Sequence, residues 1–172
     1  MKQLEKIALD HINLTLNEGD FVTVIGGNGA GKSTMLNAVA GVWPVDEGAI
    51  IGLPDFKRAT LIGRVFQDPM LGSAPDMQII ENLALAARRG KRRTLKWGVT
   101  KKEKEEYKEQ LKILDLGLED RLTQKVGLLS GGQRQALTLL MASIQKPKLL
   151  LLDEHTAALD PKTAKKVLDI TK

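Results

Sequence analysis

The sequence predicts an α/β fold with a mostly parallel sheet, and three observations support this prediction. A β-branched run at residues 21–25 stops at glycines and is followed by a helical stretch at residues 32–40. A leucine run at residues 148–152 is apolar throughout, as in strands of parallel sheets that are covered on both faces. Between these stretches the pattern is mainly helical. We therefore expect a sheet-forming core that is interrupted by a helical insertion.

The elements follow in chain order from local signals. Gly41 is expected to end the first helix. Residues 49–53 and 61–66 have the composition of two further strands. Apolar residues at helical spacing predict a helix over residues 78–89.

Three later helices are predicted from their caps. Thr100 and Glu103 form a capping box, and Gly117 is the expected end of the helix that they open. Ser130, with Gln133 three residues later, predicts a helix that runs to about residue 144. Asp160 before a proline predicts a last helix.

Composition narrows the functional classes. Of the 172 residues, 42% are hydrophobic and 27% are charged, which is ordinary for a globular chain. There is no cysteine, which excludes disulfides and thiolate metal sites. No apolar run approaches the ~20 residues that span a bilayer. We therefore expect any role at a membrane to require a partner.

The net charge of +5 is concentrated in residues 88–108, which carry ten Lys or Arg against three Glu. Such a run could contact nucleic acid or anionic lipid headgroups. The simpler interpretation, which we favour, is a solvated helix face and loop.

Residues 26–33 match the pattern G-x-x-x-x-G-K-S between a predicted strand and a predicted helix. Glycines let backbone N–H groups approach phosphates closely, and a helix N-terminus attracts anions. Lys32 is expected to reach the β- and γ-phosphates, and the Ser33 hydroxyl is expected to bind Mg²⁺. The alternative is a glycine-rich turn without a ligand. The candidate phosphate-binding residues are Gly26, Gly27, Asn28, Gly29, Ala30, Gly31, Lys32, Ser33 and Thr34.

Two carboxylates follow the leucine run. Asp153 is delivered to the edge of the sheet where such folds bind ligands, and we expect it to hold Mg²⁺. Glu154 is the candidate general base that polarises the attacking water. In isolation this pair would indicate only a surface turn, but its position after a phosphate loop favours a role in the chemistry of the bound nucleotide.

The segment Leu129-Ser130-Gly131-Gly132-Gln133 lies between the glycine loop and the acidic strand. With the three motifs in this order, nearly the whole chain resembles the nucleotide-binding subunit of an ABC transporter. The resemblance implies a P-loop NTPase core at residues 1–68 and 129–172 and a helical subdomain at residues 69–128. It also implies an incomplete antiparallel β subdomain at about residues 1–24 and 45–66.

The resemblance further implies a Mg²⁺-dependent ATPase with ATP and Mg²⁺ as ligands. Gln67 is similar to the family's Q-loop glutamine, which contacts Mg²⁺ or the attacking water. The implied catalytic residues are Glu154, Gln67 and Lys32, and the implied metal ligands are Ser33, Gln67 and Asp153. The implied contacts to the ATP of a second subunit are Ser130, Gly131, Gly132 and Gln133. A homodimer, or a pair with another ATPase subunit, then encloses two Mg-ATP.

The implied partner is an integral membrane permease, which would hold the chain at the cytoplasmic face of the membrane. Residues 63–69 and 153–161 look most like a bacterial importer subgroup for amino acids, with aromatic amino acids as the more specific interpretation. The alternative is a soluble ABC ATPase that acts on ribosomes or nucleic acid, supported only by the basic segment. A non-catalytic relic is a third alternative, against which the intact Lys32, Asp153 and Glu154 argue.

The family's adenine-stacking aromatic and its switch histidine are not found within the 172 residues. We therefore expect a chain that is truncated at both ends and that hydrolyses ATP poorly on its own.

Overall fold

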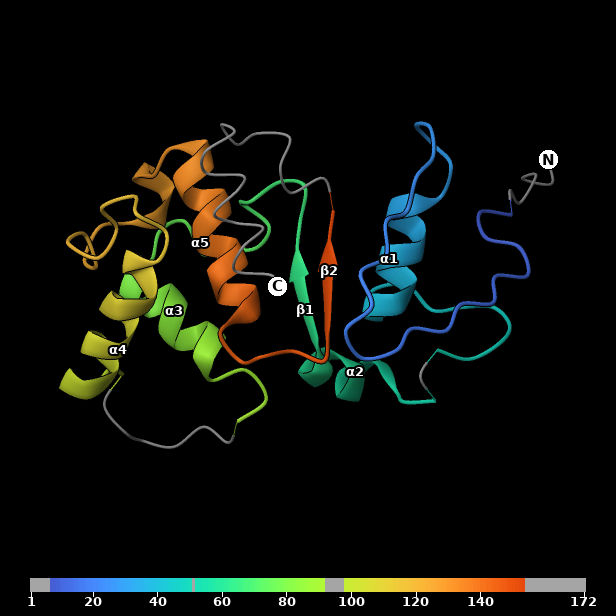
Figure 1. Ribbon diagram of the computed structural model, residues 1–172, viewed down its shortest axis with the longest axis horizontal. Coiled ribbons are helices and arrows are strands. Elements are labelled where there is room, and N and C mark those ends of the chain that lie inside the picture. The colour runs from blue at the N-terminus through green and yellow to red at the C-terminus, as the bar shows by residue number, and fades with distance from the viewer. Residues whose placement is uncertain (1–6, 51, 92–97, 154–172) are drawn as a thin grey trace. The chain divides into compact units, whose positions relative to one another are not determined.

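A computed structural model describes residues 7–50, 52–91 and 98–153 (Figure 1). The chain divides into two compact units, residues 1–59 and residues 60–172. The predicted last helix after Asp160 lies outside the described residues.

The first unit is organised around helix α1 (Lys32–Ala40), as predicted. Gly41 ends α1 in the left-handed conformation, with φ 80°. Helix α2 (Asp55–Leu61) begins in this unit and was not predicted. Arg58 of α2 is buried and donates to the carbonyl oxygens of Ala38 and Val39 at 3.1 and 3.3 Å, while it also pairs with Asp55. The side chain of Arg58 thus caps the C-terminal end of α1.

The predicted strands at residues 21–25 and 49–53 are wrong for the part of the chain that is described. Neither segment forms a ladder there, and Phe21 and Ile25 are 77% and 90% exposed. A β-branched run has the propensity for a strand, but a strand also needs a hydrogen-bonded neighbour. None of the described residues pairs with residues 21–25.

The second unit contains two parallel strands, β1 (Ile62–Val65) and β2 (Leu149–Leu152). Each strand was predicted, at residues 61–66 and 148–152, but the pairing of the two was not. In register, Ile62 lies opposite Leu149 and Val65 opposite Leu152. Leu151 is buried, whereas the other three leucines of β2 are half-buried. Two-sided burial of this strand is therefore incomplete.

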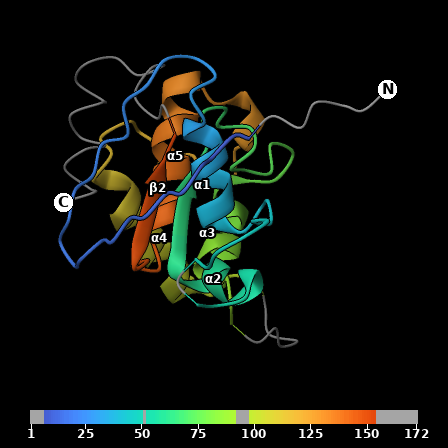
Figure 2. The same ribbon diagram turned by 90° about the vertical axis from the view of Figure 1, so that its right-hand side faces the viewer.

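Helices α3 (Ile79–Ala87), α4 (Lys101–Lys112) and α5 (Gly131–Ser143) pack beside the strands, and a short 3₁₀ turn (Val126–Leu128) leads into α5. Helix α5 contacts β1, α3 and α4, so it lies at the centre of the unit (Figures 1 and 2). All three predicted helices are confirmed. The predicted end of α4 at Gly117 is wrong, because α4 stops at Lys112 and Asp115 already has a positive φ of 52°.

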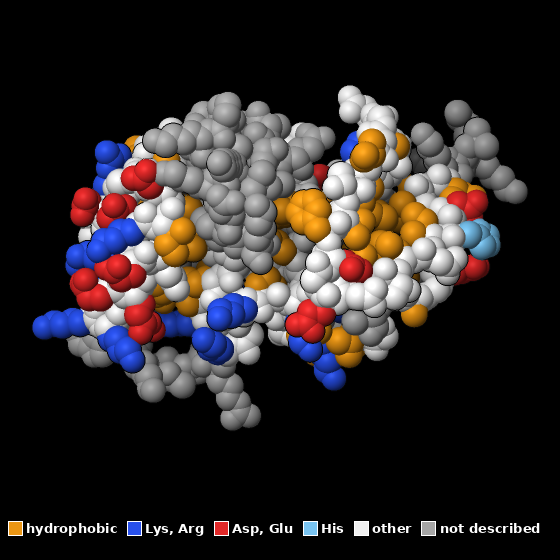
Figure 3. Space-filling model, in the orientation of Figure 1, with side chains coloured by type: hydrophobic (Ala, Val, Ile, Leu, Met, Phe, Trp, Pro, Cys, Tyr) orange, Lys and Arg blue, Asp and Glu red, His pale blue; other side chains and the backbone are white. Residues whose placement is uncertain are grey.

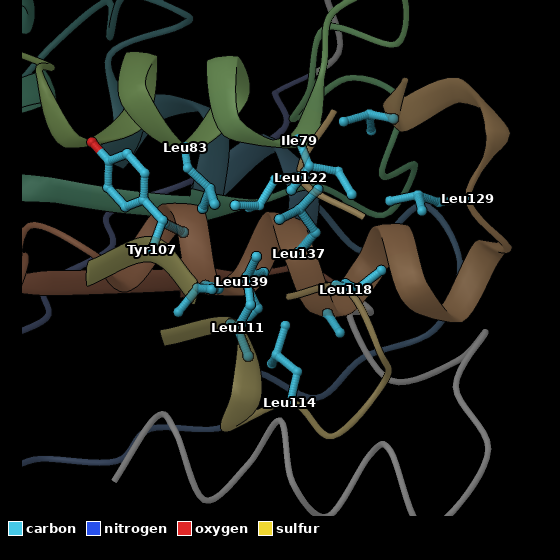
Figure 4. Close-up of a cluster of buried hydrophobic side chains, with 14 of the residues drawn as sticks. Ile79, Leu83, Tyr107, Leu111, Leu114, Leu118, Leu122, Leu129, Leu137 and Leu139 are labelled. Atoms are coloured by element: carbon cyan, nitrogen blue, oxygen red, sulfur yellow. The ribbon is translucent and has the colours of Figure 1, made fainter. Parts of the chain in front are cut away.

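The core of this unit gathers apolar side chains from the three helices and the loops between them (Figure 4). Its fully buried members include Ile79, Leu83, Leu111, Leu118 and Leu137. Burial of such side chains contributes roughly 1.5–3 kcal/mol each. The helical insertion and α5 therefore share one core, which holds the N-terminal end of α5 in place.

Candidate nucleotide-binding site

The glycine loop immediately precedes α1. Gly29 and Gly31 have positive φ angles of 78° and 86°, which side chains rarely tolerate. A Cβ added to Gly27 or Gly29 would meet no atom within 4 Å, so the loop surface is open. Gly31 has a second constraint, because a Cβ there would lie 2.9 Å from the Ala8 carbonyl oxygen. The conformation of the loop thus depends on its glycines.

Lys32 crosses this loop. Its Nζ donates to the carbonyl oxygens of Gly26 and Gly27 at 2.8 and 3.0 Å. Gly31, the N-cap of α1, supplies no side-chain hydrogen bond to the first turn. A helix N-terminus without a capping side chain, an exposed glycine loop and an adjacent ammonium group together fit a polyphosphate. Ser33, in the first turn of α1, is exposed and has the hydroxyl chemistry of a Mg²⁺ ligand.

In the second unit, Asp153 and Gln67 follow the two paired strands. Because Val65 lies opposite Leu152, both chain segments leave the sheet at the same carboxyl edge, and the N–H of Asp153 donates to the Val65 carbonyl at 3.2 Å. Gln67 is exposed and Asp153 is half-buried. The carboxyl edge is where open α/β sheets bind ligands. Glu154 lies outside the described residues.

Arg64 lies near this edge and was not singled out from the sequence. Its guanidinium lies over the Phe66 ring, 4.4 Å from the centroid. Burial lowers the pKa of Arg64, and the charge of Asp153 partly offsets that effect. The half-buried carboxylate of Asp153 thus has a cationic neighbour on the adjacent strand.

The signature segment forms the N-terminal end of α5. Ser130 Oγ accepts from the Gln133 N–H at 3.3 Å, and Gln133 Oε1 accepts from the Ser130 N–H at 3.2 Å, which confirms the predicted capping box. Gln133 also donates through Nε2 to the Leu116 carbonyl at 3.5 Å. Ser130 and Gly131 are exposed, and a Cβ on Gly131 would meet nothing within 4 Å. The first turn has no acidic residue. This helix start can therefore receive an anion.

Arg134, in the first turn of α5, was also missed. Its guanidinium donates to the carbonyls of Val126, Gly127 and Leu129, which precede the helix. An arginine next to a glycine-rich helix start is the only signal that the sequence offered for it.

The described part of the basic segment consists mainly of α4, where lysines alternate with glutamates. Ion pairs join Lys102 to Glu106, Lys108 to Glu105 and Lys112 to Glu109. Figure 3 shows the resulting mixture of acidic and basic side chains on the visible face of this unit. The mixture is typical of a solvated helix face and not of a continuous basic surface.

A P-loop at a helix start, a parallel strand pair with polar residues at its carboxyl edge and a second capped helix start define a class of nucleotide-binding α/β protein. The family model described as "ABC transporter" matches residues 9–157. The chain belongs to the ABC transporter family and is an ATP-binding, ATP-hydrolysing cassette that binds Mg-ATP.

Curated relatives are similar over nearly the whole chain. A tyrosine transport ATP-binding protein of Clostridioides difficile is 44% identical over 169 residues, which cover 94% of this chain and 67% of the relative. A phosphonates import ATP-binding protein of Oceanobacillus iheyensis is 36% identical, in a match that covers 95% of this chain and 68% of the relative. The chain thus spans about two thirds of the length of these relatives.

Solved structures agree with the fold. A dimeric ATP-binding cassette in a post-hydrolysis state, bound to ADP and Pi, has a TM-score of 0.79 and 31% identity. The match covers 95% of this chain and 73% of that chain. A nucleotide-free ATP-binding cassette from an ABC transporter has a TM-score of 0.73 and 28% identity, covering 95% and 69%. The predicted P-loop NTPase fold is therefore confirmed.

The transport class is confirmed by the same matches, and the alternative of action on ribosomes or nucleic acid is not favoured. Within residues 7–50, 52–91 and 98–153, no helix is long and apolar enough to cross a bilayer.

Proposed function

We propose that this chain dimerises around two Mg-ATP and drives import through a separate membrane permease. Each ATP would lie between the glycine loop of one copy and the start of α5 in the other copy. The observation that supports this most directly is the exposure of Ser130 and Gly131 at a helix N-terminus that carries no acidic residue. Such an end attracts an anion, and an exposed end is accessible to a second molecule.

The residue roles follow from the chemistry of each group. Lys32 would neutralise phosphate charge, and Ser33 and Asp153 are the residues that would hold Mg²⁺, which would supply positive charge to the phosphoryl group during hydrolysis. Gln67 positions the metal or the water, and Glu154 accepts the proton of the attacking water. The contacts to the partner's ATP come from Ser130, Gly131, Gly132 and Gln133. Gln133 already makes two hydrogen bonds within its own unit, so the backbone N–H groups and the Ser130 hydroxyl are better suited to the phosphate.

Dimerisation can be tested with Glu154→Gln, which removes the proposed base and retains the size of the side chain. We expect a dimer with ATP and Mg²⁺, and a monomer without nucleotide, by size-exclusion chromatography with light scattering. The double variant Glu154→Gln and Lys32→Ala is the matched control and is expected to remain monomeric. A Glu154→Gln chain that stays monomeric at saturating Mg-ATP would refute the dimer.

We further propose that residues 69–128 form the subdomain that contacts the permease, while residues 1–68 and 129–172 form the ATPase core. Helices α3 and α4 fall within residues 69–128. Met70 and Leu71, at the beginning of this stretch, are 39% and 69% exposed and offer an apolar contact. Contact with a permease would place the chain peripherally on the cytoplasmic face of the membrane. Copurification of an integral membrane protein with the wild type, lost with Leu71→Asp, would support this assignment, whereas equal recovery would contradict it.

For the substrate we propose an amino acid, most specifically an aromatic one. The support is the 44% identity to a tyrosine transport protein, which exceeds the 36% identity to a phosphonates import protein. Uptake of labelled tyrosine by cells that carry Lys32→Ala in place of the wild type should fall to the background. Unchanged uptake of tyrosine, phenylalanine and tryptophan in those cells would exclude this substrate class.

A further inference from the structure

Arg134 folds back over the chain segment that leads into α5. Its Nε donates to the Val126 carbonyl at 3.3 Å, and its Nη2 donates to the carbonyls of Gly127 and Leu129, each at 3.0 Å. These three carbonyls belong to the four residues immediately before Ser130. A planar guanidinium with several fixed donors is suited to holding such a loop, whereas a lysine ammonium is not. Arg134 therefore holds the segment that leads into Ser130.

The location of this cation is unfavourable for the helix alone. A positive charge in the first turn opposes the helix dipole. Three carbonyl acceptors offset that cost, and they direct the guanidinium toward the preceding loop. Together with the absence of acidic residues from the first turn of α5, Arg134 makes this end of the helix more positive. That charge is appropriate if the end of the helix faces a phosphate.

Arg134 also reaches the turn that follows Gln67. Its Nη1 lies 2.8 Å from Met70 Sδ. The turn itself is ordered by Asp68, whose Oδ1 accepts from the Met70 N–H at 2.8 Å. The turn packs on α5, since a Cβ at Gly72 would lie 3.3 Å from Thr138 Cγ2. One side chain thus joins two segments that are 64 residues apart in sequence.

We propose that Arg134 is a positioning residue that sets the start of α5 for contact with the partner's ATP and links it to the turn at residues 68–72. A permease segment on Met70 and Leu71 would then act on the composite ATP site through the guanidinium of Arg134. This inference rests on the proposed function, because it requires the start of α5 to bind nucleotide in a dimer.

The test compares Arg134→Ala and Arg134→Lys with Arg121→Ala, a control that removes an exposed arginine of the same unit. We measure the affinity of the monomer for a fluorescent ATP analogue, ATP-dependent dimerisation in the Glu154→Gln background, and kcat in the wild-type background. For Arg134→Ala we expect monomer affinity within twofold of wild type and kcat reduced about 100-fold, since a misplaced site group can have that effect. The dimer dissociation constant should rise at least about tenfold. For Arg134→Lys we expect a kcat and a dimer dissociation constant between those of wild type and Arg134→Ala. Arg121→Ala should match wild type in all three measurements.

The link to the turn is tested with Met70→Leu, which keeps the apolar volume and removes the sulfur acceptor. We expect the dimer dissociation constant to rise about threefold, with no additional effect when Met70→Leu is combined with Arg134→Ala, because the two changes remove one contact. If Arg134→Ala does not fold, Arg134→Lys and Met70→Leu decide the question.

The outcomes separate this inference from the function on which it rests. A Glu154→Gln chain that fails to dimerise with Mg-ATP overturns the proposed function, and this inference with it. Normal dimerisation and hydrolysis by Arg134→Ala overturn the inference alone. Parallel losses of monomer ATP affinity and dimerisation also overturn it, because they would indicate a general structural role. Additive effects of Met70→Leu and Arg134→Ala refute the link to the turn.

Discussion

Replacing Gly63 by alanine tests the packing that holds α5 against the sheet. A Cβ at this position would lie 2.6 Å from the Ala142 carbonyl oxygen and 2.9 Å from both Leu150 Cδ1 and Pro147 Cγ. Ordinary contacts of a Cβ begin at 3.4 Å, so the helix backbone and the strand must separate by roughly 0.8 Å at this point. The carbonyl belongs to the backbone of α5, and it cannot move without the helix.

Overpacking of this kind costs about 1–3 kcal/mol, and we expect about 2 kcal/mol for Gly63→Ala because the nearest atom is a backbone atom. With a urea m-value of about 2 kcal/mol/M, the midpoint of unfolding should fall by about 1 M. The measurement is urea unfolding followed by circular dichroism. ATP-dependent dimerisation should weaken as well, because α5 carries Ser130.

Gly98→Ala is the matched control, since Gly98 is exposed and a Cβ there would meet no atom within 4 Å. Its stability should stay within about 0.5 kcal/mol of wild type. A midpoint for Gly63→Ala within about 0.25 M of wild type, at an unchanged m-value, would show that the close approach of α5 and β1 is wrong.

Two further predictions concern the helical insertion. Asn82 is 1% exposed, and its side chain accepts from the Ala74 N–H and donates to the carbonyls of Ala74 and Gln78. In Asn82→Ala the Ala74 N–H loses its acceptor, whereas the carbonyls of Ala74 and Gln78 keep the backbone N–H groups of Met77 and Asn82 as donors. The variant should lower the free energy of unfolding by about 1–3 kcal/mol in urea unfolding, and a loss below about 0.5 kcal/mol would contradict this role. Hydrogen bonds from the backbone and hydroxyl of Thr100, and then from Arg88, lower the pKa of Glu103 to about 2 from 4.5. The stabilisation by this carboxylate is therefore complete above about pH 4.5 and is lost as the pH falls toward 2. Glu103→Gln should be less stable than wild type by about 0.5–1 kcal/mol at pH 7. This difference in the free energy of unfolding should be smaller at pH 2.5. A difference that is constant from pH 7 to pH 2.5 would argue against the shifted pKa.

The candidate site shows how far local sequence information extends. The glycine loop, Lys32 and the capping box of Ser130 and Gln133 were predictable, because each depends on residues within one turn of a helix or loop. The roles of Arg64 and Arg134 were not predictable. Arg64 lies beside Asp153 only because β1 and β2 pair, and Arg134 meets Met70 only because α5 packs on a distant turn.

The sequence by itself determined the family and predicted helices α1, α3, α4 and α5, since caps, periodicity and motifs depend on residues that lie close together in the chain. Tertiary structure decided the rest. Residues 21–25 have the propensity for a strand but find no ladder partner among the described residues. The close approach of α5 to Gly63 and the contact of Arg134 with Met70 arise from long-range packing. Such contacts join residues that are far apart in the sequence, so local patterns do not reveal them.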